Sequence, residues 1–261
     1  MSEWTIDTTV GELLRREHVR EDGVKITEGW PDLDLGTAYR IQDALLGRKT
    51  SGGQRVVGVK LGLTSRAKQR RMGVDVPLTG WLTDAMTLAP GEPVAVGEFI
   101  HPRVEPEIAF IMGARLSGPG VTAEQAMSAV RSVHAGFEVI DSRYRDFDFA
   151  LPDVVADNAS ACRYVVSGRA VSPEGLDLAE ESCRLGVDGE TADTATGAAV
   201  LGHPANALAL AANGLAERGL AIEPGWIVLT GGLTDAVPLH PGRAISVAFD
   251  SLGALSLTGT R

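Results

Sequence analysis

The stretch HPRVEPEIAF, residues 101–110, is the one around which the fold is expected to be built, because it carries two acidic residues inside an apolar run. Glu105 and Glu107 are separated by one residue, so a strand over 104–111, with its period of two, points both carboxylates to one face. Like charges held close together are unfavourable unless a cation or a proton intervenes. The stretch therefore predicts either a solvated sheet face, the commoner cause of alternating Glu, or a cation site.

Glu138 is the third acidic residue of the expected site. It has apolar neighbours on both sides in a second short run, GFEVIDSR at 136–143, and no lysine stands close to either run in the sequence. Three carboxylates on β structure favour a hard divalent metal, because Mg²⁺ takes oxygen ligands and keeps waters that a substrate can replace. Mn²⁺ also fits oxygen ligands. We therefore predict a magnesium or manganese site at Glu105, Glu107 and Glu138.

Lys60 stands in the middle of RVVGVKLGLTS at 55–65, an apolar, β-branched run that predicts a strand. A lysine in such a run commonly snorkels to solvent or pairs with an acid. Beside a carboxylate site, its charged form is favoured by those carboxylates and disfavoured by burial, which makes it a candidate proton donor or enolate stabiliser. The residues alone leave both interpretations open.

Two further stretches carry polar or glycine-rich clusters. Asp157, Asn158 and Ser160 precede an apolar run and are typical of a turn, although their amide and hydroxyl groups are also suited to binding a substrate carboxylate. The stretch TGGLT, 230–234, has neither the spacing nor the following helix of a phosphate-binding loop. We therefore reject a nucleotide site there.

The expected elements are helical at the N-terminus and richer in strands afterwards. Apolar spacing predicts helices within residues 1–50, and a helix over 122–134 with Thr122 as its N-cap and Gln125 three residues later. Another helix is expected to begin at Pro204 and to end before Gly219. Strand and turn patterns fill most of the remainder, so the pattern predicts an α+β fold and not the regular alternation of a doubly wound one.

Composition excludes several classes of function. The 261 residues carry a formal net charge of -10 at pH 7, whereas a nucleic-acid-binding protein normally presents a basic face. No run approaches the roughly 18 apolar residues of a membrane span, and the first residues lack the pattern of an export signal. Cys162 and Cys183 give neither a disulfide framework nor zinc spacing. We therefore expect a cytoplasmic protein that binds neither nucleic acid nor membrane.

Seven short stretches, in order along the chain, resemble the fumarylacetoacetate hydrolase superfamily. They are GVKLGLTS, GVDVPLTGWL, HPRVEPEIAF, EVIDSRY, VVADNAS, GAAVLGHP and LTGGLTDAVPL. The resemblance covers about residues 25–261. Within the superfamily, the sequence is more similar to one branch, the hydratases and decarboxylases of the catechol meta-cleavage pathway. Members of that branch hydrate 2-hydroxypenta-2,4-dienoate or decarboxylate 2-oxo-3-hexenedioate (4-oxalocrotonate). The stretches LGHP, TGGLTDAVP and SRAKQRRMGVD, and a neutral PLTG where hydratases tend to carry an acidic residue, are more similar to the decarboxylating members.

The resemblance implies a mixed β-roll with a smaller helical N-terminal part. On that basis residues 1–75 would form the helical region and residues 76–261 the catalytic domain. The resemblance also implies magnesium, or manganese, at the three glutamates that the strand pattern predicts, and Lys60 as the active-site lysine. The positions that match the substrate-lining blocks are Leu78, Thr79, Asn158 and Ser160.

The implied activity is decarboxylation of 2-oxo-3-hexenedioate, a small 2-oxo dicarboxylate, to 2-hydroxypenta-2,4-dienoate and CO₂. The implied partners are further copies of the chain and the matching hydratase. Three alternatives stay open: a 2-hydroxypenta-2,4-dienoate hydratase, an acylpyruvate hydrolase, and a non-catalytic partner subunit on the same fold. The intact set of Lys60, Glu105, Glu107 and Glu138 argues against the last of these.

Overall fold

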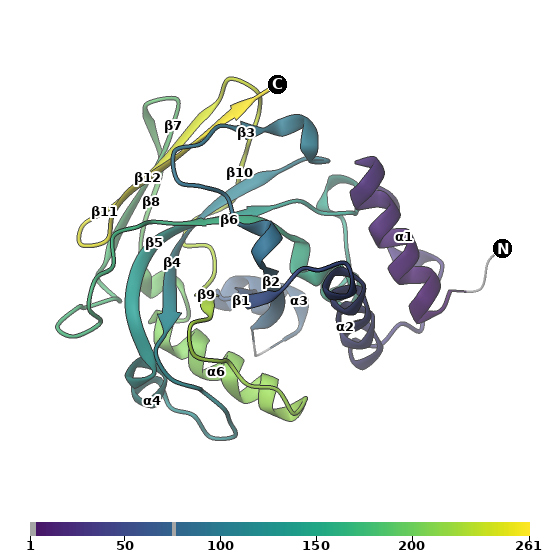
Figure 1. Cartoon of the computed structure of the whole chain (residues 1–261), viewed down its shortest axis with the longest axis horizontal. Helices are drawn as coiled ribbons and strands as arrows, with labels where there is room; N and C mark the ends of the chain where they lie inside the picture. Colours follow the sequence, from purple (N-terminus) through teal and green to yellow (C-terminus); the bar gives the residue numbers. More distant parts are fainter. Residues whose placement is uncertain (1–3, 75–76) are drawn as a thin grey trace.

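Two mixed β-sheets and a helical N-terminal part make up the molecule, as the computed structural model shows for residues 4–74 and 77–261 (Figure 1). The predicted α+β class is confirmed. In Figure 1 the N-terminal helices lie at the right, and the strands of the smaller sheet lie at the upper left. The predicted boundary between residues 75 and 76 lies outside the described residues and stays a prediction.

The helical part contains α1 (Ile6–Val19) and α2 (Leu35–Ser51), which pack with the short helix α5 (Leu151–Ala156). Asp34 begins α2, because its side chain accepts a hydrogen bond from the N–H of Thr37 at 2.6 Å. The apolar faces of these helices form one buried cluster, whose members include Val10, Leu13, Ile41, Leu45, Leu78 and Val155. Since Leu78 belongs to a strand, this cluster fixes the helices on the larger sheet.

The larger sheet has seven strands and carries all of the predicted metal ligands. Its order is β2 (Leu78–Thr83), β1 (Val56–Gly62), β9 (Ile227–Leu229), β4 (Arg103–Met112), β5 (Val130–Ile140) and β6 (Ala161–Val166), with β10 (Val237–Pro238) also paired to β4. The β1–β9 pair is parallel and the other pairs are antiparallel. The β4–β5 register places Glu105 directly opposite Glu138.

The smaller sheet has five strands in the order β3 (Val94–Ala95), β12 (Gly253–Thr260), β11 (Ala244–Phe249), β7 (Ser182–Val187) and β8 (Glu190–Thr196). One hydrophobic cluster joins both sheets to α4 (Ala123–Ser128) and α6 (Pro204–Glu217). Its buried members include Phe110, Phe137, Ala126, Leu208 and Val247. The remaining helix, α3 (Arg66–Met72), follows β1.

The predicted helix over 122–134 is wrong in its second half. Thr122 and Gln125 do form a capping box, but α4 ends at Ser128 and residues from Val130 onward form β5. Val130 and Val133 are β-branched and buried, and β5 pairs with β4 along most of its length. Pairing with a distant strand therefore overrides the local helical pattern. The helix predicted to begin at Pro204 is confirmed as α6.

A glycine allows β1 to lie close to β9. A Cβ atom on Gly58 would lie 2.0 Å from the carbonyl oxygen of Ile227, so any side chain there would force the two strands apart. In the parallel β1–β9 pair, Lys60 lies opposite Leu229. On its other side β9 pairs with β4, the strand that carries Glu105 and Glu107.

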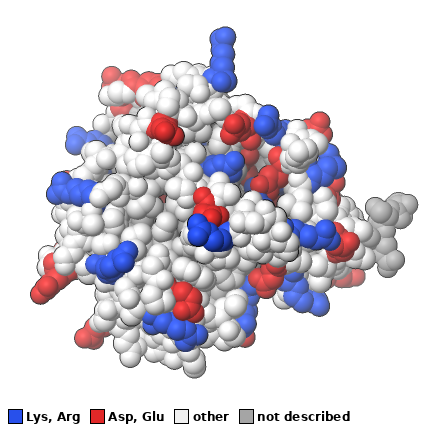
Figure 2. All heavy atoms as spheres, in the orientation of Figure 1, with Lys and Arg blue, Asp and Glu red and all other residues white. Residues whose placement is uncertain are grey.

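The surface carries charges of both signs. Figure 2 shows Lys and Arg interspersed with Asp and Glu over the face in view. Cys162 and Cys183 are buried free thiols, so the expected lack of a disulfide framework is confirmed for this pair. Within the described ranges, no helix combines the length and the hydropathy that crossing a bilayer requires.

Candidate metal centre and active site

The structure brings together the three glutamates named from the sequence. Glu105 and Glu107 extend from β4 and Glu138 from β5, and one carboxylate oxygen of each lies within 4.8 Å of those of the other two. Glu107 and Glu138 are 0% exposed, whereas Glu105 is partly exposed. The shared face that the alternation predicted therefore points inward, and the interpretation as a solvated sheet face is wrong for β4.

Lys60 completes the cluster from β1. Its Nζ lies 3.0 Å from Oε2 of Glu138, and the two side chains are 4% and 1% exposed. Burial lowers the pKa of Lys60, but attraction to Glu138, Glu105 and Glu107 outweighs it and raises the pKa above the ordinary value. The lysine is therefore a buried ammonium ion at neutral pH.

Among the described residues, one ammonium ion, that of Lys60, faces the two fully buried glutamates of the site. Burial raises the pKa of Glu107 well above its ordinary value, and repulsion from Glu138 and Glu105 raises it further. Burial likewise raises the pKa of Glu138 to about 7, against the opposing attraction of Lys60. Among the residues that the structure describes, the two fully buried carboxylates, Glu107 and Glu138, share the single ammonium of Lys60, so bound protons or another cation are favoured there.

Unsatisfied oxygen atoms point to a cation. Oε2 of Glu107 accepts a hydrogen bond from the N–H of Gly231 at 2.6 Å. Oε1 of Glu107 and Oε1 of Glu138 are buried and receive no hydrogen bond from any described residue. Buried oxygens without donors are costly in a folded protein. An all-oxygen set of this kind fits a hard divalent ion such as Mg²⁺ or Mn²⁺.

The backbone after β9 supports the glutamates in a way that the sequence did not predict. Besides donating to Glu107, Gly231 has φ 114, a conformation that favours glycine. A Cβ atom on Gly232 would lie 2.8 Å from the carboxyl group of Glu105. The TGGLT stretch is therefore the backbone wall of the carboxylate site, and its two adjacent glycines were the signal available in the sequence.

Two adjoining cavities lie beside the cluster. The first, of about 200 Å³, is lined by Lys60 and Glu105 at its polar end. The second, of about 630 Å³, includes Glu105 and Arg103. The two cavities share an apolar wall and one glutamate: Leu63, Glu105, Ile140, Phe147 and Phe149. No pattern in the sequence pointed to the two phenylalanines, which come from the loop after β5.

The predicted substrate-binding residues divide into two pairs. Leu78 and Ser160 line the smaller cavity, and Oγ of Ser160 is buried without a hydrogen-bond partner among the described residues. Thr79 and Asn158 are not among its lining residues. The carbonyl of Thr79 accepts a hydrogen bond from Gln42, and the amide of Asn158 bonds both the N–H and the carbonyl of Trp81. Substrate contacts by Thr79 and Asn158 stay predictions.

The loop that carries Ser160 is held in a rare conformation. Asn158, Ala159 and Ser160 have φ of 51, 54 and 57, values that cost free energy for residues with a Cβ atom. Asp157, just before them, forms a buried ion pair with Arg143. Burial raises the pKa of Asp157 to about 6, against the opposing attraction of Arg143. The ion pair and the Asn158 amide together fix the loop against the sheet.

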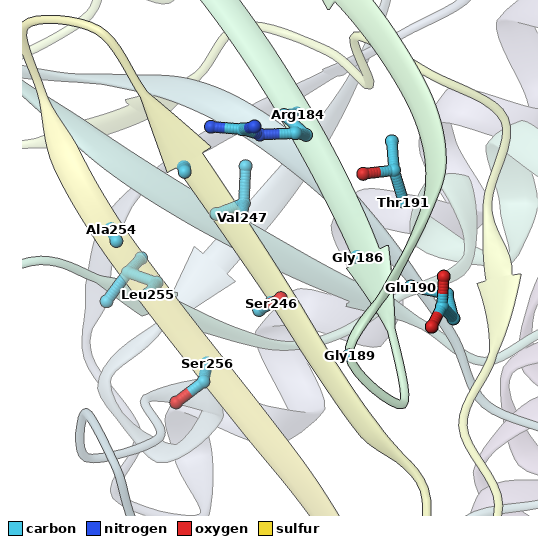
Figure 3. A pocket seen from close by; sticks show the side chains of 11 residues that line it. Arg184, Gly186, Gly189, Glu190, Thr191, Ser246, Val247, Ala254, Leu255 and Ser256 are labelled. Atoms are coloured by element: carbon cyan, nitrogen blue, oxygen red, sulfur yellow. The ribbon is translucent and has the colours of Figure 1, made fainter.

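A separate hollow of about 530 Å³ lies on the five-stranded sheet (Figure 3). Figure 3 shows side chains from β7, β8, β11 and β12 around it, among them Arg184, Thr191 and Ser256. Within the described part of the chain, only the three glutamates place three metal-ligating side chains together. The chemistry of this fold is therefore expected at the glutamate cluster and not at this hollow.

Comparison with known proteins agrees with this site. The family described as "Fumarylacetoacetate (FAA) hydrolase C-terminal" matches residues 55–258. A 4-oxalocrotonate decarboxylase of Pseudomonas sp. (strain CF600) is 43% identical over 232 residues, which are 89% of this chain and 88% of that protein. A 2-hydroxypent-2,4-dienoate hydratase of Pseudomonas putida is 40% identical over 222 residues, 85% of this chain and 100% of the relative.

A solved structure agrees as well. The 4-oxalocrotonate decarboxylase from Pseudomonas putida G7, complexed with magnesium and adipate, superposes with a TM-score of 0.94 at 39% identity. The superposition covers 98% of each chain. The match therefore extends over both sheets and the N-terminal helices. Taken together with the family match over most of the sequence, this means that the chain belongs to the fumarylacetoacetate hydrolase family.

Proposed function

We propose that this protein is a metal-dependent decarboxylase that converts 2-oxo-3-hexenedioate (4-oxalocrotonate) to 2-hydroxypenta-2,4-dienoate and CO₂ in aromatic meta-cleavage catabolism. The observation that carries the proposal is the buried cluster of three glutamates and Lys60 at the end of an apolar cavity. The likeness to decarboxylases over nearly the whole chain supports it. The adipate in the related structure is a six-carbon dicarboxylate, as is the proposed substrate.

Glu105, Glu107 and Glu138 are the residues that would hold the metal ion. Their donor set contains only oxygen, and one oxygen each of Glu107 and Glu138 lacks a hydrogen-bond donor among the described residues. Both features fit magnesium, which the related decarboxylase structure contains, and manganese as well. When bound, the ion supplies Lewis acidity to the 2-oxo acid end of the substrate. The three carboxylates otherwise act by holding negative charge next to Lys60, which keeps the lysine protonated.

Lys60 then stabilises the charge that forms during the reaction. As the C5–C6 bond breaks and CO₂ leaves, its electron pair moves through the C3–C4 double bond onto the C2 oxygen. The buried ammonium of Lys60 lies beside the carboxylates that mark this end of the site, where a fixed positive charge stabilises the developing oxyanion. Lys60 is also the proton donor that yields the enol product.

The remaining lining residues orient the substrate and exclude water. Ser160 offers a buried hydroxyl that has no hydrogen-bond partner in the described part of the chain, and this group is suited to a hydrogen bond with the substrate's C1 carboxylate. Leu63, Phe147 and Phe149 form an apolar wall along the carbon chain. A wall of this kind keeps water from the carbanion-like carbon, so that charge flows to the oxygen.

A hydratase is the second candidate. Relatives named as hydratases are 35–40% identical over 85–90% of this chain, so the same site residues could serve a water addition. A hydratase would require a positioned water or a base at the distal carbon. At Thr79, where hydratases of the family tend to carry an acid, this chain has a neutral residue, which supports the decarboxylase.

The test is an ultraviolet assay with magnesium on two substrates in parallel, 2-oxo-3-hexenedioate and 2-hydroxypenta-2,4-dienoate, with chelator controls. The expected result is magnesium-dependent consumption of the first substrate with release of CO₂. Consumption of the second substrate alone would make the protein a hydratase. If neither substrate reacts, the decarboxylase proposal fails and acylpyruvates become the next substrates to assay.

We also propose that the chain assembles with copies of itself and with the matching hydratase in the cytoplasm, and that residues 1–75 and 76–261 form the helical and catalytic parts. Strand β1, which carries Lys60, lies before that boundary but pairs with β2 in the larger sheet. Lys60 would therefore belong to the first part by its position in the sequence and to the catalytic sheet by its position in the structure. Light scattering of the purified protein, and co-elution with the hydratase, test the assembly. A monomer that never co-elutes would refute it.

A further inference from the structure

We propose that Arg103 binds the second carboxylate of the substrate, far from the three glutamates, and that it selects dicarboxylates over monocarboxylates. This inference rests on the proposed function and assigns the distal end of the same site. The smaller cavity accounts for one end of a 2-oxo dicarboxylate. Its other charged end requires a cation within reach, and Lys60 is already paired with Glu138.

Arg103 lies on the strand that carries the metal-site residues. It precedes Glu105 by two residues on β4, so both side chains lie on the same face of the sheet. Arg103 and Glu105 line the cavity of about 630 Å³. Through Phe147 and Phe149 this cavity adjoins the one that contains Lys60, so the two cavities form one path from Lys60 to Arg103.

The spacing along β4 matches the substrate. Two residues of a strand span roughly 6–7 Å. An extended six-carbon chain, with five carbon–carbon bonds of about 1.5 Å in a zigzag, separates its terminal carbons by roughly 6 Å. A molecule whose first carboxylate lies at Glu105 and whose chain runs parallel to β4 therefore brings its second carboxylate to Arg103.

The guanidinium of Arg103 is held in place but is not neutralised. It lies 4.2 Å from the ring centre of Phe147, and among the described residues it has no carboxylate partner. Stacking on an aromatic ring leaves the in-plane N–H groups available for a bidentate carboxylate. Phe147 also packs against the ring of His101, with 4.8 Å between the two ring centres, which helps to hold it in place. This arrangement is a preorganised anion site.

The acidic residues of the cavity do not cancel this charge. Asp148 forms an ion pair with Lys25 at 2.9 Å, so its charge is already compensated. Glu105, which also lines the cavity, belongs to the candidate metal site. Among the described lining residues, this leaves Arg103 and Asp235 as the other two charged side chains. The bidentate geometry available to Arg103 decides which of the two contacts the ligand.

The role predicts a particular kinetic pattern. The carboxylate at Arg103 is the one that leaves as CO₂, so its contact with the guanidinium weakens as the transition state forms. An interaction that is stronger with the substrate than with the transition state lowers KM without raising kcat. Replacing Arg103 should therefore raise KM and leave kcat unchanged or higher.

The experiment measures binding by titration calorimetry in the presence of magnesium, with two unreactive probes that differ only at the distal end. 2-Oxoadipate carries the second carboxylate, and 2-oxohexanoate lacks it. The wild-type protein should bind 2-oxoadipate about 10- to 100-fold more tightly, the value of a charge-assisted bidentate contact. In Arg103→Gln this preference should fall to about 3-fold or less, with the affinity for 2-oxohexanoate unchanged.

Two further variants complete the test. Arg103→Lys, which keeps the charge but not the fork, should show an intermediate preference. Arg145→Gln removes an exposed arginine, paired with Asp22, from the loop that carries Phe147, and should keep the wild-type preference. An equal loss of affinity for both probes in Arg103→Gln, or an intact preference of this variant for 2-oxoadipate, would overturn the proposal. Failure of the decarboxylase assay is a separate result, since these probes report binding without turnover.

Discussion

Strands β4 and β8 each carry two acidic residues, but only those of β4 belong to the candidate metal site. On β4, Glu105 and Glu107 face inward and meet Glu138 and Lys60. On β8, residues 190–194 are all exposed, so Glu190 and Asp193 face solvent. The solvated sheet face that was the alternative interpretation of the glutamates thus describes β8, not β4.

The difference lies in the position of each strand within its sheet. β4 has β9 and β5 as neighbours, and the glycine-rich backbone after β9 closes over its carboxylates. β8 is one of the two edge strands of the smaller sheet, and among the described strands it pairs only with β7. An exposed carboxylate remains hydrated, whereas a buried one requires a partner. A pair of acids on a strand therefore indicates a site only when the tertiary structure removes water from it.

The largest effect is expected from a substitution on β4, the strand whose glutamates face inward. Glu107→Gln keeps the side-chain shape and an acceptor for the N–H of Gly231, but it removes the charge. We expect magnesium-dependent activity to fall about a thousandfold or more, because the metal contributes several kcal/mol to the transition state. The metal-free variant should unfold at the wild-type temperature or above, since an amide is less costly to bury. Full activity in this variant would remove Glu107 from the metal site.

Replacing the lysine should have the next largest effect. Lys60→Met keeps the apolar stem and removes the ammonium 3.0 Å from Glu138. We expect kcat to fall about 100- to 1,000-fold with a much smaller change in KM, because the charge acts on the developing oxyanion. Lys49→Met is the matched control, since it breaks a lysine–glutamate pair of 2.6 Å with Glu17 in the helical part. An unchanged kcat in Lys60→Met would place the catalytic proton donor elsewhere.

Metal binding should stabilise the protein more at high pH. Burial raises the pKa of Glu138 from 4.5 to about 7, and that of Glu107 is also raised. A pKa that is higher in the folded protein stabilises the metal-free fold below about pH 4.5, and this contribution is lost as the pH rises through about 7. Magnesium requires the deprotonated carboxylates, so its stabilising effect grows over the same range.

Scanning calorimetry at pH 5.5 and pH 8 measures this effect. Saturating magnesium should raise Tm by on the order of 5 °C at pH 8 and by much less at pH 5.5. In Glu107→Gln the dependence on pH should be smaller, because one of the titrating ligands is gone. An equal gain in Tm at both pH values would show that the glutamates are not the ligands.

The smallest effect is expected from a substitution on β8, the strand whose acidic residues face solvent. Glu190→Gln changes an acid of β8 at the rim of the hollow in Figure 3. Because this side chain is hydrated, we expect kcat/KM and Tm to stay within about 2-fold and about 2 °C of the wild type. The same assays and calorimetry apply. A large loss of activity here would mean that the two regions are not functionally distinct.

Prediction from the sequence succeeded where the signal is local. The alternation of Glu105 and Glu107, and the apolar neighbours of Glu138, identified the cluster before any fold was known. It failed for residues 130–134, where the sequence has a helical pattern but forms the first part of β5, because pairing with β4 outweighs that pattern. Neither Arg103 nor Phe147 was predicted to be a site residue, since the importance of each comes from the side chains that it contacts.

By itself, the sequence determined the strand alternation, the Thr122–Gln125 capping box, the helix that begins at Pro204 and the family resemblance. The interactions behind the first three act within a few residues. Only the tertiary structure decided which acids lose their water, that Lys60 pairs with Glu138, and that the glycines at 231 and 232 enclose the carboxylates. Those outcomes depend on the register and packing of strands far apart in the chain. Burial matters because a charged side chain that loses its water requires a proton, a cation or an opposite charge as a partner.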